Sequence, residues 1–331
     1  MPVRWRALLA VPAACAAGLV LSATAFSAGC SAQEGTRPRT EDKARRLVPI
    51  PACVIPLPPR KAGTAGIMRT LPENQLWRLV YPSFDTEKNR LPERAPVCTG
   101  DALLDDKLFE GGLPLRGSWP LAIEEGDLHL GSGGERLRLI WLRSHRFGDG
   151  TTGGALALTR VQEDFAEVYA VGALRARPGE KTRLGIERMG PEVVPTVTDD
   201  GCLKRAPNEP CETILHLYVA RKGVLSPVAD VVLERVVYAM ATEPGINGRI
   251  EYHLTTSPQF SAGGLKLLEQ VKVADEKGKP LRKAELERML TIDGGKPMKA
   301  SDPPLWPRLA PSASAIVTPP PAPSASASAS K

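Results

Sequence analysis

Residues 213–220 read TILHLYVA, and the alternation within this stretch decides the fold class. In an extended strand, successive side chains point to opposite faces of a sheet. The two faces here carry different sets of residues, namely Ile214, His216 and Tyr218 on one face and Leu215, Leu217 and Val219 on the other. A sustained period of two predicts a β-strand.

Similar short apolar segments, separated by turn residues, fill the second half of the chain. The further strand candidates are GALALTRV (154–161), AEVYAVGAL (166–174), ADVVLERVVYAM (229–240), GRIEYHLTT (248–256) and LKLLEQVKV (265–273). Asn247-Gly248 is a turn signal, and ADEKGKP (274–280) is typical of a hairpin loop. We therefore predict a mostly β body, built as an antiparallel sandwich or meander with one or two short helices.

Three segments are compatible with helices. RKAELERML (282–290) has apolar residues at helical spacing, although LERMLTI (286–292) also reads as the strand that follows the hairpin loop. GDALLDDKLF (100–109) fits a short helix. ENQLWRLVY (73–81) fits either a strand or a helical turn. These alternatives stay open at the level of sequence.

The chain divides into five segments by composition. Residues 1–29 are an apolar leader, and the charged residues 30–46 read as a flexible stalk. The body divides into an N-terminal part, 47–150, and an antiparallel β region, 151–305, because the Gly-rich loop FGDGTTGG (147–154) marks a candidate boundary. Residues 306–331 end almost wholly in Pro, Ala and Ser, which predicts a disordered tail.

The first residues have the order of a secretory signal. MPVRWR (1–6) carries Arg4 and Arg6 without an acidic residue, and an apolar run of about 20 residues follows. A run of that length could also span a bilayer as a retained anchor, but Pro12 and the many small residues favour a cleaved signal.

The residues Ser27-Ala28-Gly29-Cys30 resemble the lipobox of bacterial lipoproteins. They differ from the commonest form at Ser27, where Leu, Val or Ile is more usual. The resemblance implies cleavage before Cys30, acyl chains on that residue and, because the non-acidic Ser31 follows, an outer-membrane location. Signal peptidase cleavage after Ala25 or after Ala32 is the alternative.

Six cysteines occur in the chain: Cys15, Cys30, Cys53, Cys98, Cys202 and Cys211. Cleavage before Cys30 and acylation of that residue leave four thiols, which an exported protein would oxidise in pairs. We predict Cys53–Cys98 and Cys202–Cys211, the nearest-neighbour pairing. A zinc site is the competing use, but none of these cysteines has C-x₂-C spacing or a nearby histidine.

No catalytic pattern is complete. The Gly-rich segment GDGTTGG (148–154) lacks the lysine of a phosphate-binding P-loop and reads as a turn. Ser132 in LGSGGE (130–135) lacks the first glycine of a nucleophile elbow. The four histidines, His129, His145, His216 and His253, have no metal-ligand spacing, although a catalytic set assembled from distant residues stays open.

Charged groups give two weaker hypotheses. The pair Asp199-Asp200, at the mouth of the proposed Cys202–Cys211 loop, could hold calcium, but a solvated turn is the simpler interpretation, as it is for Asp105-Asp106 and Glu124-Glu125. Two sets of basic residues could together meet an anionic envelope polymer or lipid phosphates, although solvated faces are the simpler interpretation. They are Arg136, Arg138, Arg143 and Arg146, and Arg175, Arg177, Lys181 and Arg183.

The sequence thus predicts an exported lipoprotein of the bacterial envelope, with a non-enzymatic β body that binds or supports something at the membrane surface. The alternative is a secreted hydrolase. The net charge of +6 falls to +4 once the two leader arginines are removed, which gives little support to a nucleic-acid partner. We predict no catalytic residues, no metal site and no cofactor; the partners would be the membrane, through Cys30, and an anionic envelope component or envelope protein.

Overall fold

The structure is a computed structural model. It describes residues 47–59, 70–92, 95–100, 112–115, 120–131, 136–241, 248–292, 296–311 and 316. All of these belong to one compact unit, Asp42–Lys331. The predicted leader, the lipidated Cys30, the stalk, the helix candidate 100–109 (apart from Gly100) and nearly all of the Pro/Ala/Ser-rich tail lie outside the described residues.

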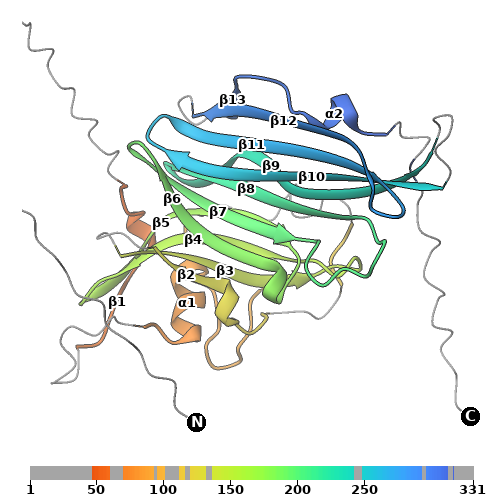
Figure 1. The fold of residues 1–331 in the computed structure, drawn as a ribbon. Coiled ribbons are helices and arrows are strands. Elements are labelled where there is room, and N and C mark those ends of the chain that lie inside the picture. Colours follow the sequence, from red (N-terminus) through yellow and green to blue (C-terminus); the bar gives the residue numbers. More distant parts are fainter. Residues whose placement is uncertain are drawn as a thin grey trace, which may run out of the picture. The chain divides into compact units, whose positions relative to one another are not determined.

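The body is mostly β, as predicted (Figure 1). Its strands are β1 (Val54–Pro56), β2 (Leu128–Leu130), β3 (Leu137–Arg146), β4 (Thr152–Val161), β5 (Phe165–Ala176), β6 (Thr182–Met189), β7 (Glu192–Asp200), β8 (Cys211–Arg221), β9 (Gly223–Met240), β10 (Arg249–Ser261), β11 (Gly264–Asp275), β12 (Pro280–Thr291) and β13 (Lys299–Ala300). The α-helices of the described residues are α1 (Glu73–Val80) and α2 (Trp306–Leu309), and short 3₁₀ turns lie at Pro51–Cys53, Glu125–Asp127 and Gly179–Lys181.

The strands form one hydrogen-bonded network with a branch at β9. Its main path runs β13-β12-β11-β10-β9-β5-β4-β3-β2, and β6, β7 and β8 branch from β9. Almost every pairing is antiparallel. The link between β9 and β5 is parallel and joins Ala170 to Gly223 and Val171 to Val224.

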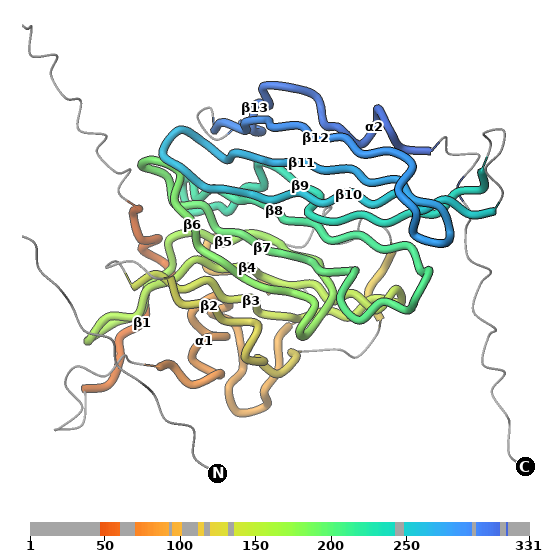
Figure 2. Tube along the Cα trace, in the orientation of Figure 1, coloured from red at the N-terminus to blue at the C-terminus, as the bar shows by residue number. Residues whose placement is uncertain are grey.

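The strands stack in layers, as the tube in Figure 2 shows. The β3–β4–β5 layer has two buried faces. One face packs Ile140 and Leu142 against Trp77 and Tyr81, which come from α1 and the residue after it. The other face packs a second cluster, which includes Trp141, against β6, β7 and β8.

β8 is buried along one face and partly buried along the other, which explains the sequence of TILHLYVA. Leu215, Leu217 and Val219 share an apolar cluster with residues of β11 and β12. Tyr218, on the opposite face, joins the cluster formed with β3, β4 and β5. A strand between two layers needs apolar side chains at both parities, whereas a half-buried strand would show polar residues along one whole face.

The structure places three segments that the sequence leaves open or assigns by composition. Residues 282–290 lie in strand β12, where Ala284, Leu286 and Arg288 share a face with residues of β11. The loop at residue 150 is the turn between β3 and β4, which pair from Leu137 to Arg146. Residues 306–309 form the short helix α2.

Residues 305–309 are ordered by contacts with the sheet. Leu305 is buried and, with Trp306 and Leu309, covers Val271 and Val273 of β11. Apolar burial of this kind stabilises the ordered position of these residues on the sheet.

A buried ion pair fixes this C-terminal segment. The Glu269 side chain is 4% exposed, and its Oε1 accepts a hydrogen bond from Arg288 Nε at 2.6 Å. Its Oε2 accepts a hydrogen bond from the Leu305 backbone N–H at 2.7 Å. Glu269 therefore links β11, β12 and the segment that leads into α2.

We expect Glu269→Gln to lower the free energy of unfolding by about 3 kcal/mol, because it leaves the guanidinium of Arg288 buried without a counter-charge. Glu287→Gln is the matched control, since Glu287 pairs with Lys266 at the surface and exposed pairs contribute about 0–1 kcal/mol. Urea unfolding of both variants measures the difference. Equal losses would contradict the role assigned to Glu269.

Candidate functional site

Both predicted disulfides form. Cys53 and Cys98 are joined with a Cα–Cα distance of 5.3 Å, and Cys202 and Cys211 with one of 5.0 Å. Disulfides persist in oxidising compartments, so these two disulfides indicate an extracytoplasmic location. Among the described residues, no helix has both the length and the apolar character needed to cross a lipid bilayer.

The histidines lie apart on strands. His216 Nδ1 is 2.7 Å from Asp230 on β9, and His253 Nε2 is 3.0 Å from Glu234 on the same strand. His129 lies on the short strand β2. His216 and His253 therefore belong to polar pairs between neighbouring strands.

His145 is the exception in its burial. Its side chain is buried, and its Nδ1 lies 2.8 Å from Ser144 Oγ. Burial lowers the pKa of His145 to about 4, since a charged imidazolium would lose its hydration there. Neither residue lines the two pockets described below, so this contact is part of the core.

The aspartates at the short disulfide serve the loop itself. Asp200 Oδ1 accepts hydrogen bonds from the backbone N–H groups of Cys202 and Leu203 and from Thr213 Oγ1, at distances between 2.9 and 3.1 Å. Asp199 pairs with Arg177. Within the described part of the chain, no group of three or more His, Cys, Asp or Glu is arranged to hold a metal ion. Ser132 and Asp105-Asp106 lie outside that part.

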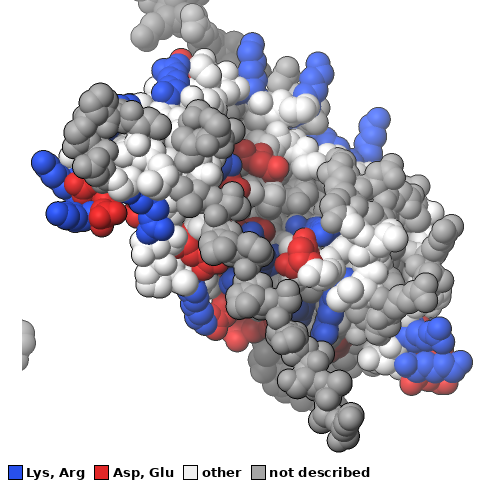
Figure 3. Space-filling view, turned by 90° about the vertical axis from the view of Figure 1, so that its right-hand side faces the viewer, with Lys and Arg blue, Asp and Glu red and all other residues white. Residues whose placement is uncertain are grey.

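Several of the basic residues are buried or are paired with carboxylates. Arg143 is 4% exposed and lies 2.7 Å from Asp127 and 3.0 Å from Glu124, and Arg138 is also buried. Carboxylates pair with further members of the two basic sets: Arg175 with Asp149, Arg177 with Asp199, and Arg183 with Asp200. Acidic and basic side chains are accordingly mixed on the face drawn in Figure 3.

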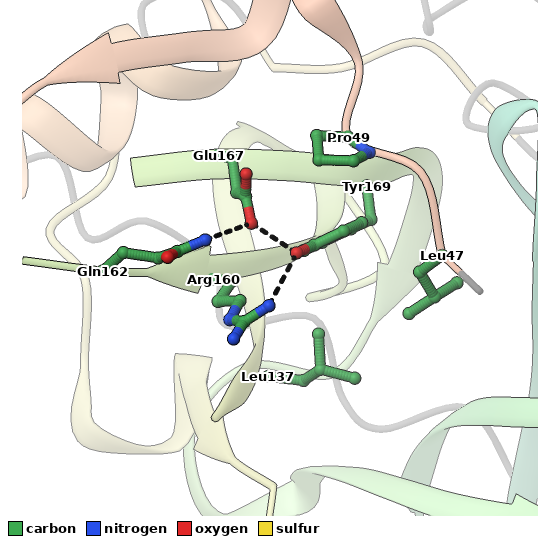
Figure 4. Close-up of a pocket in the computed structure, with 7 residues that line it drawn as sticks. All are labelled: Leu47, Pro49, Leu137, Arg160, Gln162, Glu167 and Tyr169. Atoms are coloured by element: carbon green, nitrogen blue, oxygen red, sulfur yellow. Dashed lines mark hydrogen bonds between the residues drawn. The ribbon is translucent and has the colours of Figure 1, made fainter. Parts of the chain in front are cut away.

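The best-defined site is a pocket of about 320 Å³ at one end of the β3–β4–β5 layer (Figure 4). Seven residues line it: Leu47, Pro49, Leu137, Arg160, Gln162, Glu167 and Tyr169. Arg160 on β4 and Glu167 on β5 are direct cross-strand partners close to the turn that joins these two strands. Because Glu167 and Tyr169 are two residues apart on β5, they point from the same face of the strand.

A hydrogen-bond network holds the polar side chains of this pocket. Gln162 Nε2 donates to Glu167 Oε1 at 3.0 Å, and the Tyr169 hydroxyl donates to the same oxygen. Arg160 Nη1 donates to the Tyr169 hydroxyl over a longer distance, 3.4 Å. Burial, together with the hydrogen bond to Glu167, raises the pKa of Tyr169, so the phenol is a proton donor at neutral pH and not a nucleophile.

A second pocket of about 460 Å³ adjoins the first. Leu47 and Tyr169 line both pockets, and we call the two together the Tyr169 cleft. The second pocket is completed by β7, β8 and the turn into β9, where Arg221 Nη2 lies 3.0 Å from Glu192 Oε1. The cleft therefore contains two arginines and two glutamates: Arg160 and Glu167 lie opposite each other on β4 and β5, and Arg221 forms an ion pair with Glu192.

The segment after the predicted stalk forms one wall of the cleft. Leu47 packs on the apolar cluster between the layers, and Ile50 N–H donates to the Val168 carbonyl at 2.8 Å. Antiparallel pairing of β1 with β5 continues this contact, and the Cys53–Cys98 disulfide follows. Residues 47–50 thus run directly along the cleft.

Sequence reasoning did not find the Tyr169 cleft. Its residues come from β3, β4, β5, β7, β8 and the segment before β1, so no linear motif unites them. The available signal was local: Glu167 interrupts one face of the apolar strand AEVYAVGAL, and a buried carboxylate requires a partner. That signal identifies a polar position but not its neighbours.

Comparison of the chain with models of known protein families, with curated proteins and with solved structures found no match. Its functional interpretation accordingly depends on the geometry of this molecule.

We expect removal of Cys53–Cys98 to cost more stability than removal of Cys202–Cys211. The sequence separations are 45 and 9 residues, and loop-closure entropy gives losses of about 4 and about 3 kcal/mol, respectively. Two double alanine variants, compared by urea unfolding under oxidising conditions, measure the order. A greater loss for the short loop would show that chain entropy does not govern these bonds.

We expect stability to fall as the pH drops from about 6.5 through about 4, and His145 to account for part of the slope. The folded pKa of His145 lies below its unfolded value, so the unfolded state binds the proton more tightly and acid favours unfolding. His145→Asn should therefore lose less stability between pH 7 and pH 4.5 than the parent protein does. His129→Asn is the control and should keep the parental slope in urea unfolding at both pH values.

Proposed function

We propose that this chain is an exported envelope lipoprotein, anchored through acyl chains on Cys30, whose β body binds a small polar ligand in the Tyr169 cleft. The observation that carries the binding half is the pocket around Glu167, where a buried carboxylate, a phenol, an amide and a guanidinium converge. A concave site with a few convergent polar groups among apolar walls is typical of ligand pockets.

The proposal that the chain is exported and anchored through Cys30 is supported by the start of the sequence and by the two disulfides. The signal-like leader, the lipobox-like Ser27-Ala28-Gly29-Cys30 and oxidised cysteines all suit an exported product. Each buried CH₂ of an acyl chain contributes about 0.8 kcal/mol to membrane binding, and stable anchoring needs more than one chain. The two or three chains of a bacterial lipoprotein would meet that requirement.

The stalk sets the distance between membrane and ligand. Residues 31–46 separate Cys30 from Leu47, and a chain of that length spans at most about 55 Å when fully extended. Since Leu47 lines the cleft, the ligand would be bound close to the membrane surface. An outer-membrane location and an anionic envelope partner stay predictions from the sequence.

The geometry favours binding over hydrolysis. Among the described residues that line the two pockets there is no histidine, the residue that most often serves as a general base. The secreted hydrolase therefore has no supporting observation in the described part of the chain.

We expect Cys30→Ser to abolish membrane anchoring. The full chain, expressed in a bacterial host supplied with an alkyne fatty acid, should be labelled and should partition into the detergent phase of Triton X-114. The Cys30→Ser variant should be unlabelled. Cys15→Ser is the matched control, because Cys15 lies inside the apolar leader and should be removed with it.

A mass spectrum of the mature amino terminus makes the test independent of labelling. A chain that begins at Cys30 with the mass of added acyl groups supports anchoring. A chain that begins at Phe26 or Gln33, or that has only the mass of its polypeptide, would overturn it.

A further inference from the structure

We propose that the Tyr169 cleft binds a zwitterion the size of a free amino acid or dipeptide, with its carboxylate at Arg160 and its ammonium group at Glu167. This inference rests on the proposed binding function and names the chemical class of the ligand. It draws on the charges, the size and the apolar walls of the cleft.

The charges of the cleft come in opposed pairs. Arg160 and Glu167 are cross-strand neighbours that both reach the Tyr169 hydroxyl region, as Figure 4 shows. A ligand with a single charge complements only one of these two groups, and covering the other group removes its hydration, which is costly. A zwitterion compensates both groups at once.

The side chains of Arg160 and Glu167 have the donors and acceptors that such a ligand requires. Arg160 has five N–H donors, and its hydrogen bond to Tyr169 is long at 3.4 Å. A planar guanidinium binds a carboxylate through two parallel hydrogen bonds. The carboxylate of Glu167 has several lone-pair positions, of which Gln162 and Tyr169 use two on Oε1.

The size of the cleft limits the ligand. Its two pockets, about 320 and about 460 Å³, lie in the lower part of the range of about 300–1,000 Å³ found for small-molecule sites. The first pocket suits one amino acid, whose side chain would contact Leu47, Pro49 and Leu137. The second, with Arg221 and Glu192, gives room for another residue beyond Tyr169.

The ligand would also contact the junction between stalk and body, because Leu47 and Pro49 follow the stalk directly. Binding tests therefore use the full mature chain, purified in detergent, and not a body shortened at residue 50.

The first experiment compares probes that differ by one charge. Isothermal titration with leucine and alanyl-leucine should give binding, whereas leucinamide, which lacks the carboxylate, and N-acetyl-leucine, which lacks the ammonium group, should bind at least tenfold more weakly. Equal affinity for the three leucine compounds, or no binding of leucine and alanyl-leucine, would overturn the inference.

Titrations with glucose and with inorganic phosphate distinguish a wrong ligand class from a wrong proposed function. Binding of either, without binding of the zwitterions, would overturn the ligand class but keep a binding cleft. If none of these compounds binds, the proposal that the β body binds a small polar ligand is overturned as well. The anchoring test on Cys30 is unaffected by any of these results.

The second experiment assigns each charge to its partner. Arg160→Gln should weaken leucine binding at least tenfold and abolish the preference for leucine over leucinamide. Glu167→Gln should abolish the preference for leucine over N-acetyl-leucine. These separate changes in selectivity would not follow from a general loss of structure.

Lys272→Gln on the exposed side of β11 is the control and should leave leucine binding unchanged. Arg160 is half-buried, so its variant keeps the inference testable if Glu167→Gln does not fold. Unchanged selectivity in Arg160→Gln would overturn the placement of the carboxylate.

Discussion

Strand β9 is the constraint on which the rest of the architecture depends. It pairs with β8 from Val224 to Val236 and with β10 from Glu234 to Met240, and at its start it meets β5 in parallel. Because β9 is 18 residues long, β5 pairs with its first residues and β10 with its last, so the strand extends from the β3–β4–β5 layer to the β10–β11–β12 layer. Register shifts against β8 accompany this path, and such irregularities bend and twist a strand.

The contact between β5 and β9 requires a close approach of two backbones. A Cβ atom at Gly172 would lie 2.6 Å from the Leu225 carbonyl oxygen, so any larger residue would force the strands apart. Glycine thus lets the two parts of the sheet join. The same join brings the turn between β8 and β9 beside β5, and the second pocket of the Tyr169 cleft opens between them.

Polar groups inside this core act as connectors between layers. Arg143 on β3 binds the 3₁₀ turn at Asp127, and Glu269 on β11 binds β12 and the segment before α2. Buried ion pairs gain little net stability over apolar contacts, but each specifies which segment lies over which strand. The network at Glu167 differs from these two because it lines a pocket.

The sequence by itself determined the strand character of the body and both disulfide pairings. These are local properties: a period of two along TILHLYVA and the spacing of four cysteines. It left the state of residues 73–81 and of 282–290 open, because LERML fits a helix as well as a strand until β11 supplies hydrogen-bonding partners. Only the tertiary structure decided the layers and the cleft, since Arg160, Glu192 and Leu47 become neighbours through pairings between distant segments, and no local pattern encodes those.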